Sequence, residues 1–413
     1  MHLSSITHQG FQEAYRGLSL QSHFQPIVSL SHQRVIGYEA LVRSSANARS
    51  VPPVQLFQLA SSLNEELQLD SQVRALHLQN YAAQSSHGQW LFINVNPETA
   101  TQDLANPHHL WSQLAECGLR PQQVVIEILE KRFRDEGLLH DVVAFYKQLG
   151  FLVAIDDFGA GESNFNRIWR IEPDIVKLDR SNILQAESKP QVRRILPRLI
   201  ALIRETGALT LIEGVETREQ AMIAMETEVD LLQGFYLARP EAGFLAQDET
   251  LLETIHHLHE NSLRSSQEFD NGYVLWRNRF GERMQRAAQH LSHSGNLRNA
   301  CKPLMAEDRT LRCYLLDRRG VQQGEAILQP SNLTANEQRF TPLLDSSGAC
   351  WSRRSYFRRA MAVPGRVHFS RPYMSATDGD LCMTLSLGFF SNLGQQAVIC
   401  LDLLADQLLS ASA

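Results

Sequence analysis

The sequence predicts an α/β protein in which an irregular TIM (β/α)8 barrel is followed by a helical connector and a small α+β domain. Three observations predict this fold class. Short apolar runs alternate with helical patterns over roughly the first 240 residues. The next stretch has helical periodicity alone, and the remainder returns to strand-like runs separated by turn residues. A chain of 413 residues is long enough for a barrel and a second domain.

Eight apolar runs are the candidate barrel strands. They are FQPIVSL, VIGYEAL, LFINVN, VVIEIL, FLVAIDD, PDIVKLD, ALTLIEG and DLLQGFYL. Between them lie segments with apolar residues three and four apart, such as Leu138 to Leu149 and Val192 to Glu205, which predicts helices between parallel strands. Only SHQR joins the first two runs, and this is too short for a crossover helix. We therefore expect one antiparallel hairpin in the barrel.

The domain boundaries follow from these changes in pattern. We expect the barrel over residues 1–246, the helical connector over 247–294 and the α+β domain over 295–413. The last region holds the runs LRCYLLDRRGVQ, RVHFSRPY, LCMTLSLGFF and AVICLDLL, with a helical stretch near Arg353 to Met361. Strand-like runs separated by Asp and Gly turn signals predict an antiparallel sheet.

Composition and charge exclude several classes of protein. A hydrophobic share of 43% with 20% charged residues is typical of a globular chain rather than a disordered one. A net charge of -6 argues against a nucleic acid polymer as the partner, because phosphate neutralisation needs a basic surface. The amino terminus lacks a signal peptide, and no uncharged apolar run reaches the roughly 18 residues of a membrane span, so a cytoplasmic location is expected.

The six cysteines are scattered along the chain without a CxxC pair. This spacing argues against a zinc knuckle and against a disulfide framework, and it is typical of reduced thiols.

Polar residues interrupt the candidate barrel strands near their ends. They are Glu39, Asn94, Glu127, Asp156, Asp157, Lys177, Glu213 and Gln233. Strand ends of such a barrel converge on one mouth, so five carboxylates would meet there. Like charges at that density need neutralising cations, and Mg²⁺ or Mn²⁺ prefers oxygen ligands. The sequence therefore predicts a metal site.

The adjacent pair Asp156-Asp157 is suited to holding two ions, because one carboxylate can bridge them while its neighbour binds only one. Paired ions are the usual machinery of phosphoryl chemistry. Lys177, among the carboxylates, is a candidate for orienting the nucleophilic water or stabilising developing negative charge.

At these residues the sequence resembles the EAL-domain cyclic di-GMP phosphodiesterases over about residues 20 to 245. The resemblance is carried by motifs in the family's order. They are Gln25-Pro26-Ile27, Glu39-Ala40-Leu41 with Arg43, Asn94, Glu127 with Glu130, DDFGAG from Asp156, Lys177 and Asp179 in VKLD, EGVE from Glu213, and QGFYLARP from Gln233.

The resemblance implies hydrolysis of cyclic di-GMP to linear pGpG with two Mg²⁺ or Mn²⁺ ions, by a protein that forms a homodimer. It implies that the first ion is held by Glu39, Asn94, Glu127 and Asp156, and the second by Asp156, Asp157 and Glu213. Lys177 takes the general-base or water-orienting role, and Gln233 helps to hold the water and the metal site. The family positions that hold the substrate correspond to Gln25, Leu41, Arg43 and Asp179. Family positions that support the site correspond to Glu130 and Glu216.

One segment departs from the family pattern. After DDFGAG the family usually continues with an aromatic residue and two serines, whereas this chain has Glu162-Ser163-Asn164. Glu130 matches the residue that braces this loop. The departure bears on regulation through the loop more than on catalysis, because the metal-ligating positions are filled.

Two other functions compete with the enzyme. The barrel could be a catalytically silent cyclic di-GMP receptor or scaffold that signals through the C-terminal domain, or the chain could be mainly a sensor whose barrel transmits a signal. The C-terminal region, with Trp351, Arg353, Tyr356 and Arg358, resembles a PAS-like or Cache-like sensor domain and could hold an unknown small ligand. Core packing with surface arginines is the alternative. The pairs Arg318-Arg319 and Arg353-Arg354 are interpreted as solvated charges.

Overall fold

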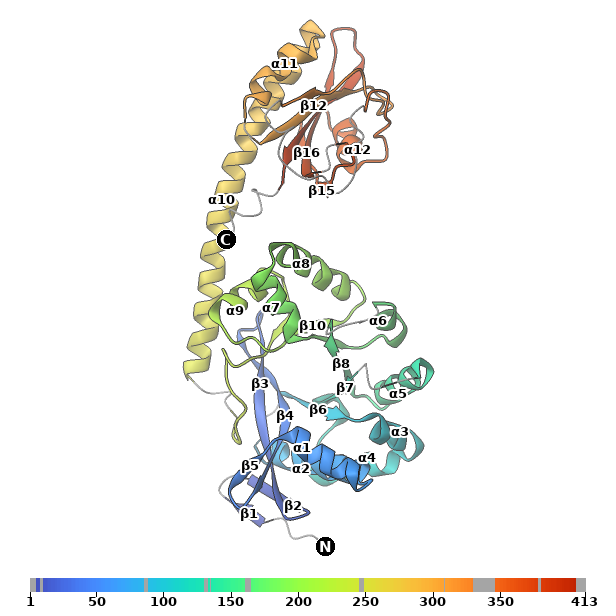
Figure 1. The fold of residues 1–413 in the computed structure, drawn as a ribbon, viewed down its shortest axis with the longest axis vertical. Helices are drawn as coiled ribbons and strands as arrows, with labels where there is room; N and C mark the ends of the chain where they lie inside the picture. Colours follow the sequence, from blue (N-terminus) through green and yellow to red (C-terminus); the bar gives the residue numbers. More distant parts are fainter. Residues whose placement is uncertain are drawn as a thin grey trace. The chain divides into compact units, whose positions relative to one another are not determined.

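The computed structural model describes residues 5–7, 10–84, 88–129, 133, 135–159, 165–244, 249–307, 309–329, 346–377 and 380–405. The chain divides into two compact units, Met1–Leu263 and Arg264–Ala413 (Figure 1). Each unit has its own sheet and its own apolar clusters.

Within the described residues of the first unit, eight strands close a barrel in the order β3-β11-β10-β9-β8-β7-β6-β4, and β4 pairs back with β3. They are β3 (Leu18–Ser29), β4 (Arg34–Ala46), β6 (Trp90–Val95), β7 (Val124–Leu129), β8 (Leu152–Phe158), β9 (Ile175–Leu178), β10 (Leu209–Ile212) and β11 (Leu231–Leu232). Strand β3 is antiparallel to both of its neighbours, and the other barrel pairs are parallel. The predicted irregular barrel with one antiparallel hairpin is confirmed.

Three short strands extend the sheet beside the barrel and were not predicted. They are β1 (Ser5–Thr7) and β2 (Gly10–Tyr15), which continue from β3, and β5 (Arg49–Val51), which pairs with β4. Their few residues carry no clear alternation, so only pairing with the longer hairpin strands stabilises them.

Helices surround the barrel strands. They are α1 (Pro53–Ser62), α2 (Glu66–Gln84), α3 (Pro97–Ala105), α4 (Pro107–Cys117), the 3₁₀ turn η1 (Pro121–Gln123), α5 (Glu136–Gln148), α6 (Phe165–Ile171), α7 (Arg180–Ser188), α8 (Pro190–Arg204) and α9 (Arg218–Met225). Several begin with proline, whose fixed φ suits the first helical position and whose missing N–H costs nothing there. Helix α5 begins instead at an Asp135 cap that accepts from Gly137 N at 2.8 Å.

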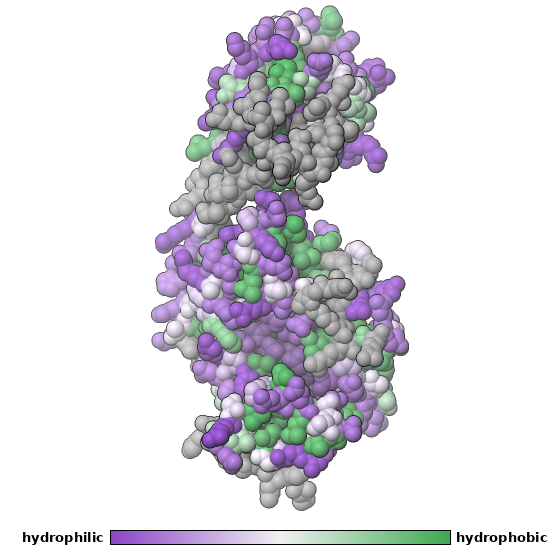
Figure 2. Space-filling model, viewed as in Figure 1, coloured by the Kyte–Doolittle hydropathy of each residue, from purple (hydrophilic) through white to green (hydrophobic). Residues whose placement is uncertain are grey.

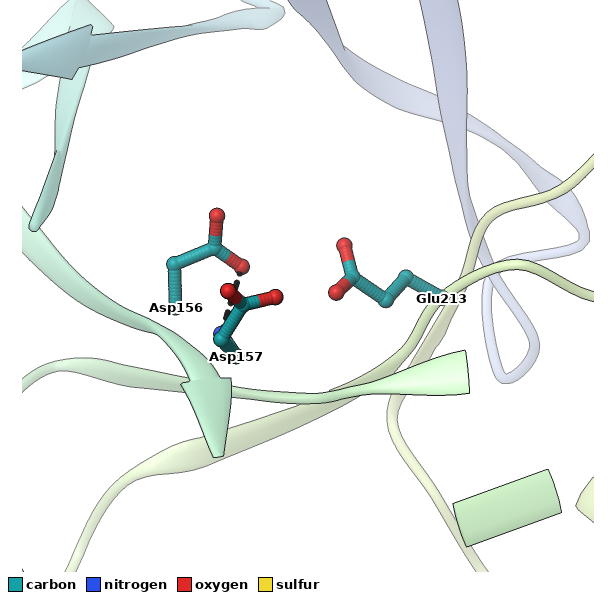
Figure 3. A group of neighbouring side chains, drawn as sticks. All are labelled: Asp156, Asp157 and Glu213. Carbon is teal, nitrogen blue, oxygen red and sulfur yellow. Dashed lines mark hydrogen bonds between the residues drawn. The ribbon is translucent and has the colours of Figure 1, made fainter. Parts of the chain in front are cut away.

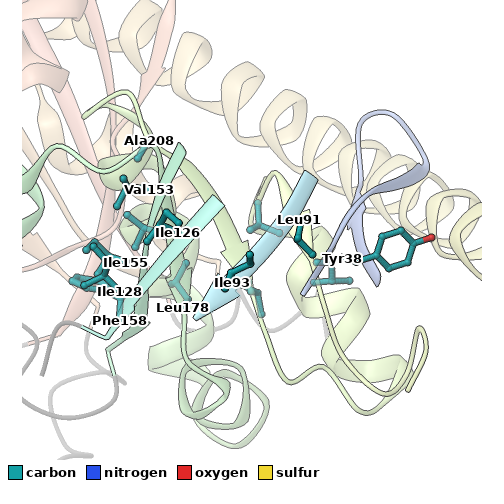
Figure 4. Packing of buried hydrophobic residues seen from close by; sticks show 14 of the residues in the cluster. Tyr38, Leu91, Ile93, Ile126, Ile128, Val153, Ile155, Phe158, Leu178 and Ala208 are labelled. Atoms are coloured by element: carbon teal, nitrogen blue, oxygen red, sulfur yellow. The ribbon is translucent and has the colours of Figure 1, made fainter. Parts of the chain in front are cut away.

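Apolar side chains form two layers around the barrel wall. The outer layer fills the space between strands and helices and includes Ile93, Ile126, Ile155 and Leu178 (Figure 4). The inner layer fills the barrel itself and consists of Ile27, Phe92, Val125, Ala154, Ile175, Leu211 and Leu231. Because side chains alternate along a strand, the next inward-facing residue lies two positions further on.

The second unit is built on an antiparallel sheet. Its six described strands have the order β13-β12-β17-β16-β14, with β15 pairing to β16. The strands are β12 (Thr310–Leu316), β13 (Ile327–Leu328), β14 (Val367–Phe369), β15 (Tyr373–Met374), β16 (Leu381–Phe390) and β17 (Gln396–Leu404). This confirms the predicted antiparallel α+β domain.

Among the described residues, helices α11 (Leu297–Met305) and α12 (Ser355–Ala362) belong to this unit, and helix α10 (Glu249–Ser294) begins in the first unit and continues into the second. Helix α10 is one helix of 46 residues where a helical connector was expected. Side chains of α10 and α11 pack on one side of the sheet, and α12 packs with side chains of the other side. Helix α11 and strand β13 were not predicted.

Cysteine pairing differs from the sequence-based expectation. Cys301 and Cys313 form a disulfide that joins α11 to β12, so the expectation of reduced thiols is wrong for this pair. The spacing of the two residues carried no signal because tertiary packing of a helix on a strand brings them together. The other described cysteines, Cys117, Cys350, Cys382 and Cys400, take part in no disulfide.

Hydrophilic side chains dominate the surface visible in Figure 2, and apolar side chains form small separate patches on it. Among the described helices we find none whose length and hydropathy would let it cross a bilayer.

The inner layer of the barrel gives a stability prediction. Phe92 is fully buried among the inner-layer side chains, so Phe92→Ala removes packing and leaves a cavity. We expect the free energy of unfolding, measured by urea denaturation, to fall by about 3–5 kcal/mol. Trp111→Ala is the control, because Trp111 is 42% exposed and its truncation should cost far less. Equal losses in both variants would contradict the inner-layer assignment.

Candidate functional site

A ring of polar side chains lies directly beyond the inner apolar layer of the barrel. Each of six parallel strands places a polar residue two positions after its inner apolar residue, and the pairs are Phe92 and Asn94, Val125 and Glu127, Ala154 and Asp156, Ile175 and Lys177, Leu211 and Glu213, and Leu231 and Gln233. On the antiparallel strand β3 the order reverses, and Gln25 precedes Ile27. The alternation of strand side chains therefore directs these polar groups to one end of the barrel.

Lys177 lies at the centre of this ring. Its Nζ is 2.7 Å from Glu127 Oε1, 3.2 Å from Asp156 Oδ1, 3.3 Å from Glu213 Oε2 and 3.7 Å from Glu39 Oε2. Lys177 and Glu127 have no exposed surface. Four predicted carboxylates, from β4, β7, β8 and the position directly after β10, thus surround the predicted lysine.

Burial and charge oppose one another at this centre. Burial alone would lower the pKa of Lys177, but the facing carboxylates raise that pKa well above its ordinary value. Burial and the nearby charge of Glu39 raise the pKa of Glu127 well above its usual range. Burial raises the pKa of Glu213 to about 8. The cluster therefore carries a lysine ammonium and too many carboxylates for all of them to ionise easily without added cations.

Two amides hold Glu39 in place. Asn94 Nδ2 donates to Glu39 Oε1 at 3.1 Å, and Gln233 Nε2 donates to Glu39 Oε2 at 2.7 Å. Burial would raise the pKa of Glu39, but Lys177 and these hydrogen bonds lower it overall. Gln233 also donates to Gln25 Oε1 at 3.3 Å, so the predicted substrate residue Gln25 adjoins the ring.

Two carboxylates of this ring and the neighbouring Asp157 form a candidate metal centre. Oxygen atoms of Asp156, Asp157 and Glu213 all lie within 4.8 Å of one another, and Figure 3 shows the three side chains facing a common space. Asp157 has φ +59, a conformation that a non-glycine residue rarely adopts, and its N–H donates to Asp156 Oδ1 at 2.9 Å. This turn brings two adjacent carboxylates to the same side of the chain.

The residues present fit divalent cations. The donor set consists of carboxylate and amide oxygens, which Mg²⁺ and Mn²⁺ prefer. Glu127 Oε2 and Gln233 Oε1 are buried without a hydrogen-bond partner among the residues that the structure describes. Such oxygens are costly to bury unless a cation or another partner satisfies them.

A cavity of about 220 Å³ adjoins the ring. Leu41 and Arg43, two predicted substrate residues, line it together with Asn94. Burial lowers the pKa of Arg43, and Arg43 Nη1 donates to Val42 O at 3.1 Å.

Helix α2 supplies the opposite wall of this cavity with residues that were not predicted. Asp70, Arg74 and His77 line it at helical spacings of four and three. The available signal was the presence of these polar residues on the same helix face as buried leucines and valines. Asn96 Nδ2 donates to Asp70 Oδ1 at 2.9 Å, which fixes one oxygen of that carboxylate.

Buried polar contacts fix the position of helix α2. Arg74 Nη1 lies 2.5 Å from Asp103 Oδ2, and Arg74 Nε donates to Gln113 Oε1 at 2.9 Å. Tyr146 OH donates to the same Asp103 oxygen at 2.8 Å. These contacts tie α2 to α3, α4 and α5, so the cavity wall is preorganised.

Other predicted residues lie outside the ring. Asp179 caps helix α7, and its Oδ1 accepts from Ser181 N at 3.0 Å. Glu216 pairs with Arg180 Nη2 at 2.5 Å. Glu130 and the segment Glu162-Ser163-Asn164 lie outside the described residues.

Comparison with known proteins agrees with this geometry. The model of the family described as "EAL domain" matches residues 8–240. The chain belongs to the EAL domain family. The match spans every barrel strand from β3 to β11.

One similar protein resembles this chain along nearly its whole length. It is the uncharacterized EAL-domain containing protein YkuI of Bacillus subtilis, 26% identical over 386 residues, which cover 88% of this chain and 90% of YkuI. A crystal structure of YkuI in complex with substrate c-di-GMP and calcium matches this structure with a TM-score of 0.77 and 23% sequence identity. The match covers 94% of this chain and 96% of the YkuI chain. This likeness shows that the two proteins share a fold.

Other relatives match the EAL domain alone. The probable cyclic di-GMP phosphodiesterase PdeB of Escherichia coli is 26% identical over 243 residues, which cover 58% of this chain and 46% of PdeB. A Klebsiella pneumoniae BlrP1 complex with manganese and cyclic di-GMP has a TM-score of 0.51 at 26% identity, with 59% of this chain and 61% of that one covered.

The central lysine gives a prediction about the EAL domain without metal. Lys177→Met leaves four carboxylates facing one another, so in the presence of a chelator we expect the free energy of unfolding to fall by about 3–5 kcal/mol. Chemical denaturation measures this loss. Lys147→Met is the control, because Lys147 is half-exposed at 3.5 Å from Asp174 and should lose less than about 1 kcal/mol. A Lys177→Met variant as stable as the control would contradict the account of this cluster.

His77 gives a prediction about acid stability. It is fully buried beside Ser22 Oγ, 2.8 Å from its Nδ1, and burial lowers its pKa to about 3. The unfolded chain binds a proton on His77 near pH 6.5 and the folded chain does not, so stability falls as pH decreases below that value. We expect His77 to account for about 2 kcal/mol of the loss between pH 8 and pH 5.

Denaturation of the wild-type chain and His77→Asn at both pH values measures this contribution. The variant should lose correspondingly less stability on acidification, whereas His140→Asn, at an exposed position, should behave like wild type. Identical pH profiles for wild type and His77→Asn would contradict burial of a neutral imidazole.

Proposed function

We propose that this EAL domain hydrolyses one phosphodiester bond of cyclic di-GMP to give linear pGpG, with two Mg²⁺ or Mn²⁺ ions. The observation that carries the proposal is the convergence of four carboxylates on Lys177 at one end of the barrel. Membership of the EAL domain family supports it, because relatives include the cyclic di-GMP phosphodiesterase RocR of Pseudomonas aeruginosa. The complexes of YkuI and BlrP1 with cyclic di-GMP and calcium or manganese support the choice of ligand and metal.

The proposed metal ligands come from neighbouring strand ends. Glu39, Asn94, Glu127 and Asp156 would hold the first ion, and Asp156, Asp157 and Glu213 the second. Bound there, the two cations would lower the pKa of water and neutralise charge on the phosphate. Gln233 keeps Glu39 oriented through its amide hydrogen bond.

Lys177 is placed to act on the water. Its ammonium faces all the surrounding carboxylates, so a water bound among them would lie within its hydrogen-bonding reach. In the proposed reaction the water oxygen bonds to phosphorus, the bond from phosphorus to the ribose 3′ oxygen breaks, and that oxygen takes up a proton. Lys177 orients the water and stabilises the negative charge that develops on the phosphate.

The adjoining cavity is proposed to hold one end of the substrate. Arg43 suits a phosphate oxygen, because a guanidinium donates in a planar fork. Leu41 offers an apolar wall for the face of a base, and the Asp70 carboxylate can accept from guanine N–H groups. Gln25, which contacts Gln233, is proposed to bind the part of the substrate nearest the metal ligands. Asp179, which follows β9, is proposed as a further substrate contact. Glu130 and Glu216 are proposed as supporting residues.

We also propose that residues 295–413 form a PAS-like or Cache-like sensor domain that regulates the barrel of residues 1–246 through the connector of residues 247–294. An antiparallel sheet with helices on its two sides supports this proposal. A homodimer and an unknown small ligand for the sensor belong to the same proposal. The competing function is a silent cyclic di-GMP receptor, which would bind the nucleotide without cutting it.

Product analysis on the purified full chain tests the proposed reaction. With Mg²⁺ or Mn²⁺ we expect conversion of cyclic di-GMP to pGpG, and Glu39→Ala should slow this conversion at least about a hundredfold, because it removes a metal ligand. Glu98→Ala, the same charge change at an exposed position of α3, should retain wild-type turnover.

The outcomes separate the proposed enzyme from its alternatives. Binding of cyclic di-GMP by the wild-type chain without any pGpG would favour the receptor. Equal turnover by wild type and Glu39→Ala would show that the assignment of Glu39 is wrong. A parallel assay with cyclic di-AMP, which lacks the guanine N–H donors, should give much slower cleavage if Asp70 recognises the base.

A further inference from the structure

The second unit contains a stretch in which arginine is the only charged residue apart from histidine. Residues 346–377 hold six arginines and no Asp, Glu or Lys: Arg353, Arg354, Arg358, Arg359, Arg366 and Arg371. Residues 264–413 as a whole have 18 basic and 13 acidic residues, whereas residues 1–263 have 21 basic and 32 acidic residues. The chain as a whole is therefore negatively charged, whereas its second unit carries a net positive charge.

The fold exposes these arginines on and around helix α12. The helix buries Tyr356, Phe357 and Ala360 against the sheet, so Arg358 and Arg359 face solvent. The other arginines of the stretch lie in exposed turns and loops on either side of the helix. None of the six forms an ion pair with a carboxylate among the described residues of the chain, although Arg354 lies 5.2 Å from the Tyr373 ring centroid. We call the six residues the arginine face.

Exposed apolar side chains lie at the adjacent end of the sheet. Phe390, the last residue of β16, is 55% exposed, and Leu393, in the turn between β16 and β17, is 79% exposed. Val363, just after α12, is 47% exposed. We call these three residues the apolar tip.

Hydrogen bonds join the chain at the end of α12 to the hairpin that carries Phe390 and Leu393. Gly365 N donates to Gly388 O at 2.8 Å, and Gln396 Nε2 donates to Met361 O at 2.9 Å. The end of α12 is therefore fastened to the hairpin, and in Figure 1 α12 lies beside β16 in the second unit. Arg366, which directly follows Gly365, therefore lies at the end of the arginine face next to the hairpin that carries Phe390 and Leu393.

We propose that the arginine face and the apolar tip together dock this protein on a membrane surface that contains anionic phospholipid. Guanidinium groups are weakly hydrated and bind phosphate oxygens in a planar fork, so they suit lipid headgroups. Exposed Phe390 and Leu393 gain free energy by entering the boundary between headgroups and acyl chains. Stable membrane binding takes two signals, and this region combines an electrostatic one with an apolar one.

Two other partners fit the region less well. A nucleic acid would attract the arginines, but it would leave the apolar tip in water and it gives Leu393 no role. A second copy of the chain meeting this region face to face would oppose two arginine faces, and like charges without intervening carboxylates repel. An anionic bilayer complements both the charge and the apolar side chains.

Vesicle co-sedimentation of the full chain tests the charge component. At physiological salt we expect binding to vesicles of phosphatidylcholine with phosphatidylserine and none to phosphatidylcholine alone. Arg358→Gln with Arg359→Gln should weaken binding roughly 25-fold, because each basic residue near an anionic surface contributes about fivefold. Arg298→Gln with Lys302→Gln is the control, since it removes the same charge from exposed positions of α11, on the other side of the sheet. It should weaken binding less than about twofold.

A second variant tests the apolar component and is independent of the charges. Phe390→Ser with Leu393→Ser leaves the net charge unchanged, and we expect it to weaken vesicle binding at least about tenfold. Both residues are mostly solvated, so the unfolding midpoint should stay close to wild type.

Three results would overturn the proposal. They are no binding of the wild-type chain to the anionic vesicles, an equal loss of binding in the α11 control, or tighter binding to duplex DNA that the Phe390 and Leu393 substitutions leave unchanged. Loss of vesicle binding in both test variants with retention in the control would support it. Vesicle binding is measured without cyclic di-GMP cleavage. If the protein proves to have no phosphodiesterase activity, the membrane-binding result therefore still stands.

Discussion

The placement of one ammonium group among four carboxylates is the interaction on which the rest of the barrel's chemistry depends. Lys177 can occupy that position because Ile175 fills the barrel interior two residues earlier, and the same alternation places Glu127, Asp156 and Glu213 in the same layer. The apolar layer below excludes water from one side. Charge held in this way is costly to bury, and the cost falls when divalent cations share the carboxylates.

The reversed first strand of the barrel contributes to the same layer. Because β3 is antiparallel to β4, Gln25 meets Gln233 and Glu39 at the end of the barrel where the parallel strands finish. The amides of Gln233 and Asn94 donate to the two carboxylate oxygens of Glu39 and fix its orientation. Helix α2, fastened through Arg74 and its buried partners, lines the cavity that adjoins this ring. The positions proposed for metal, water and substrate would thus be supported by separate elements.

The alternation of apolar runs with helical patterns, and the polar residues near the ends of those runs, explain how much could be predicted from the sequence. The eight barrel runs, the hairpin at the first two and the ring from Glu39 to Gln233 follow from local patterns that tertiary structure preserves. Asp70, Arg74 and His77 were missed because polar residues on a mostly apolar helix face indicate buried polar contacts but do not by themselves indicate a cavity. The Cys301–Cys313 disulfide was missed because it depends on how α11 packs on β12. Short edge strands such as β2 depend on their neighbours in the same way.

The two units divide the chain's charge between different tasks. The acidic first unit is suited to hold cations, and the arginine face gives the second unit an attraction for anionic surfaces. The central claim is that the carboxylates around Lys177 hold a pair of divalent ions. Anomalous diffraction from crystals of the full chain grown with Mn²⁺ and cyclic di-GMP tests it most directly. The account predicts two manganese peaks roughly 3.5–4 Å apart, both contacted by Asp156. Manganese peaks located only elsewhere, or Asp156 remote from both, would contradict it.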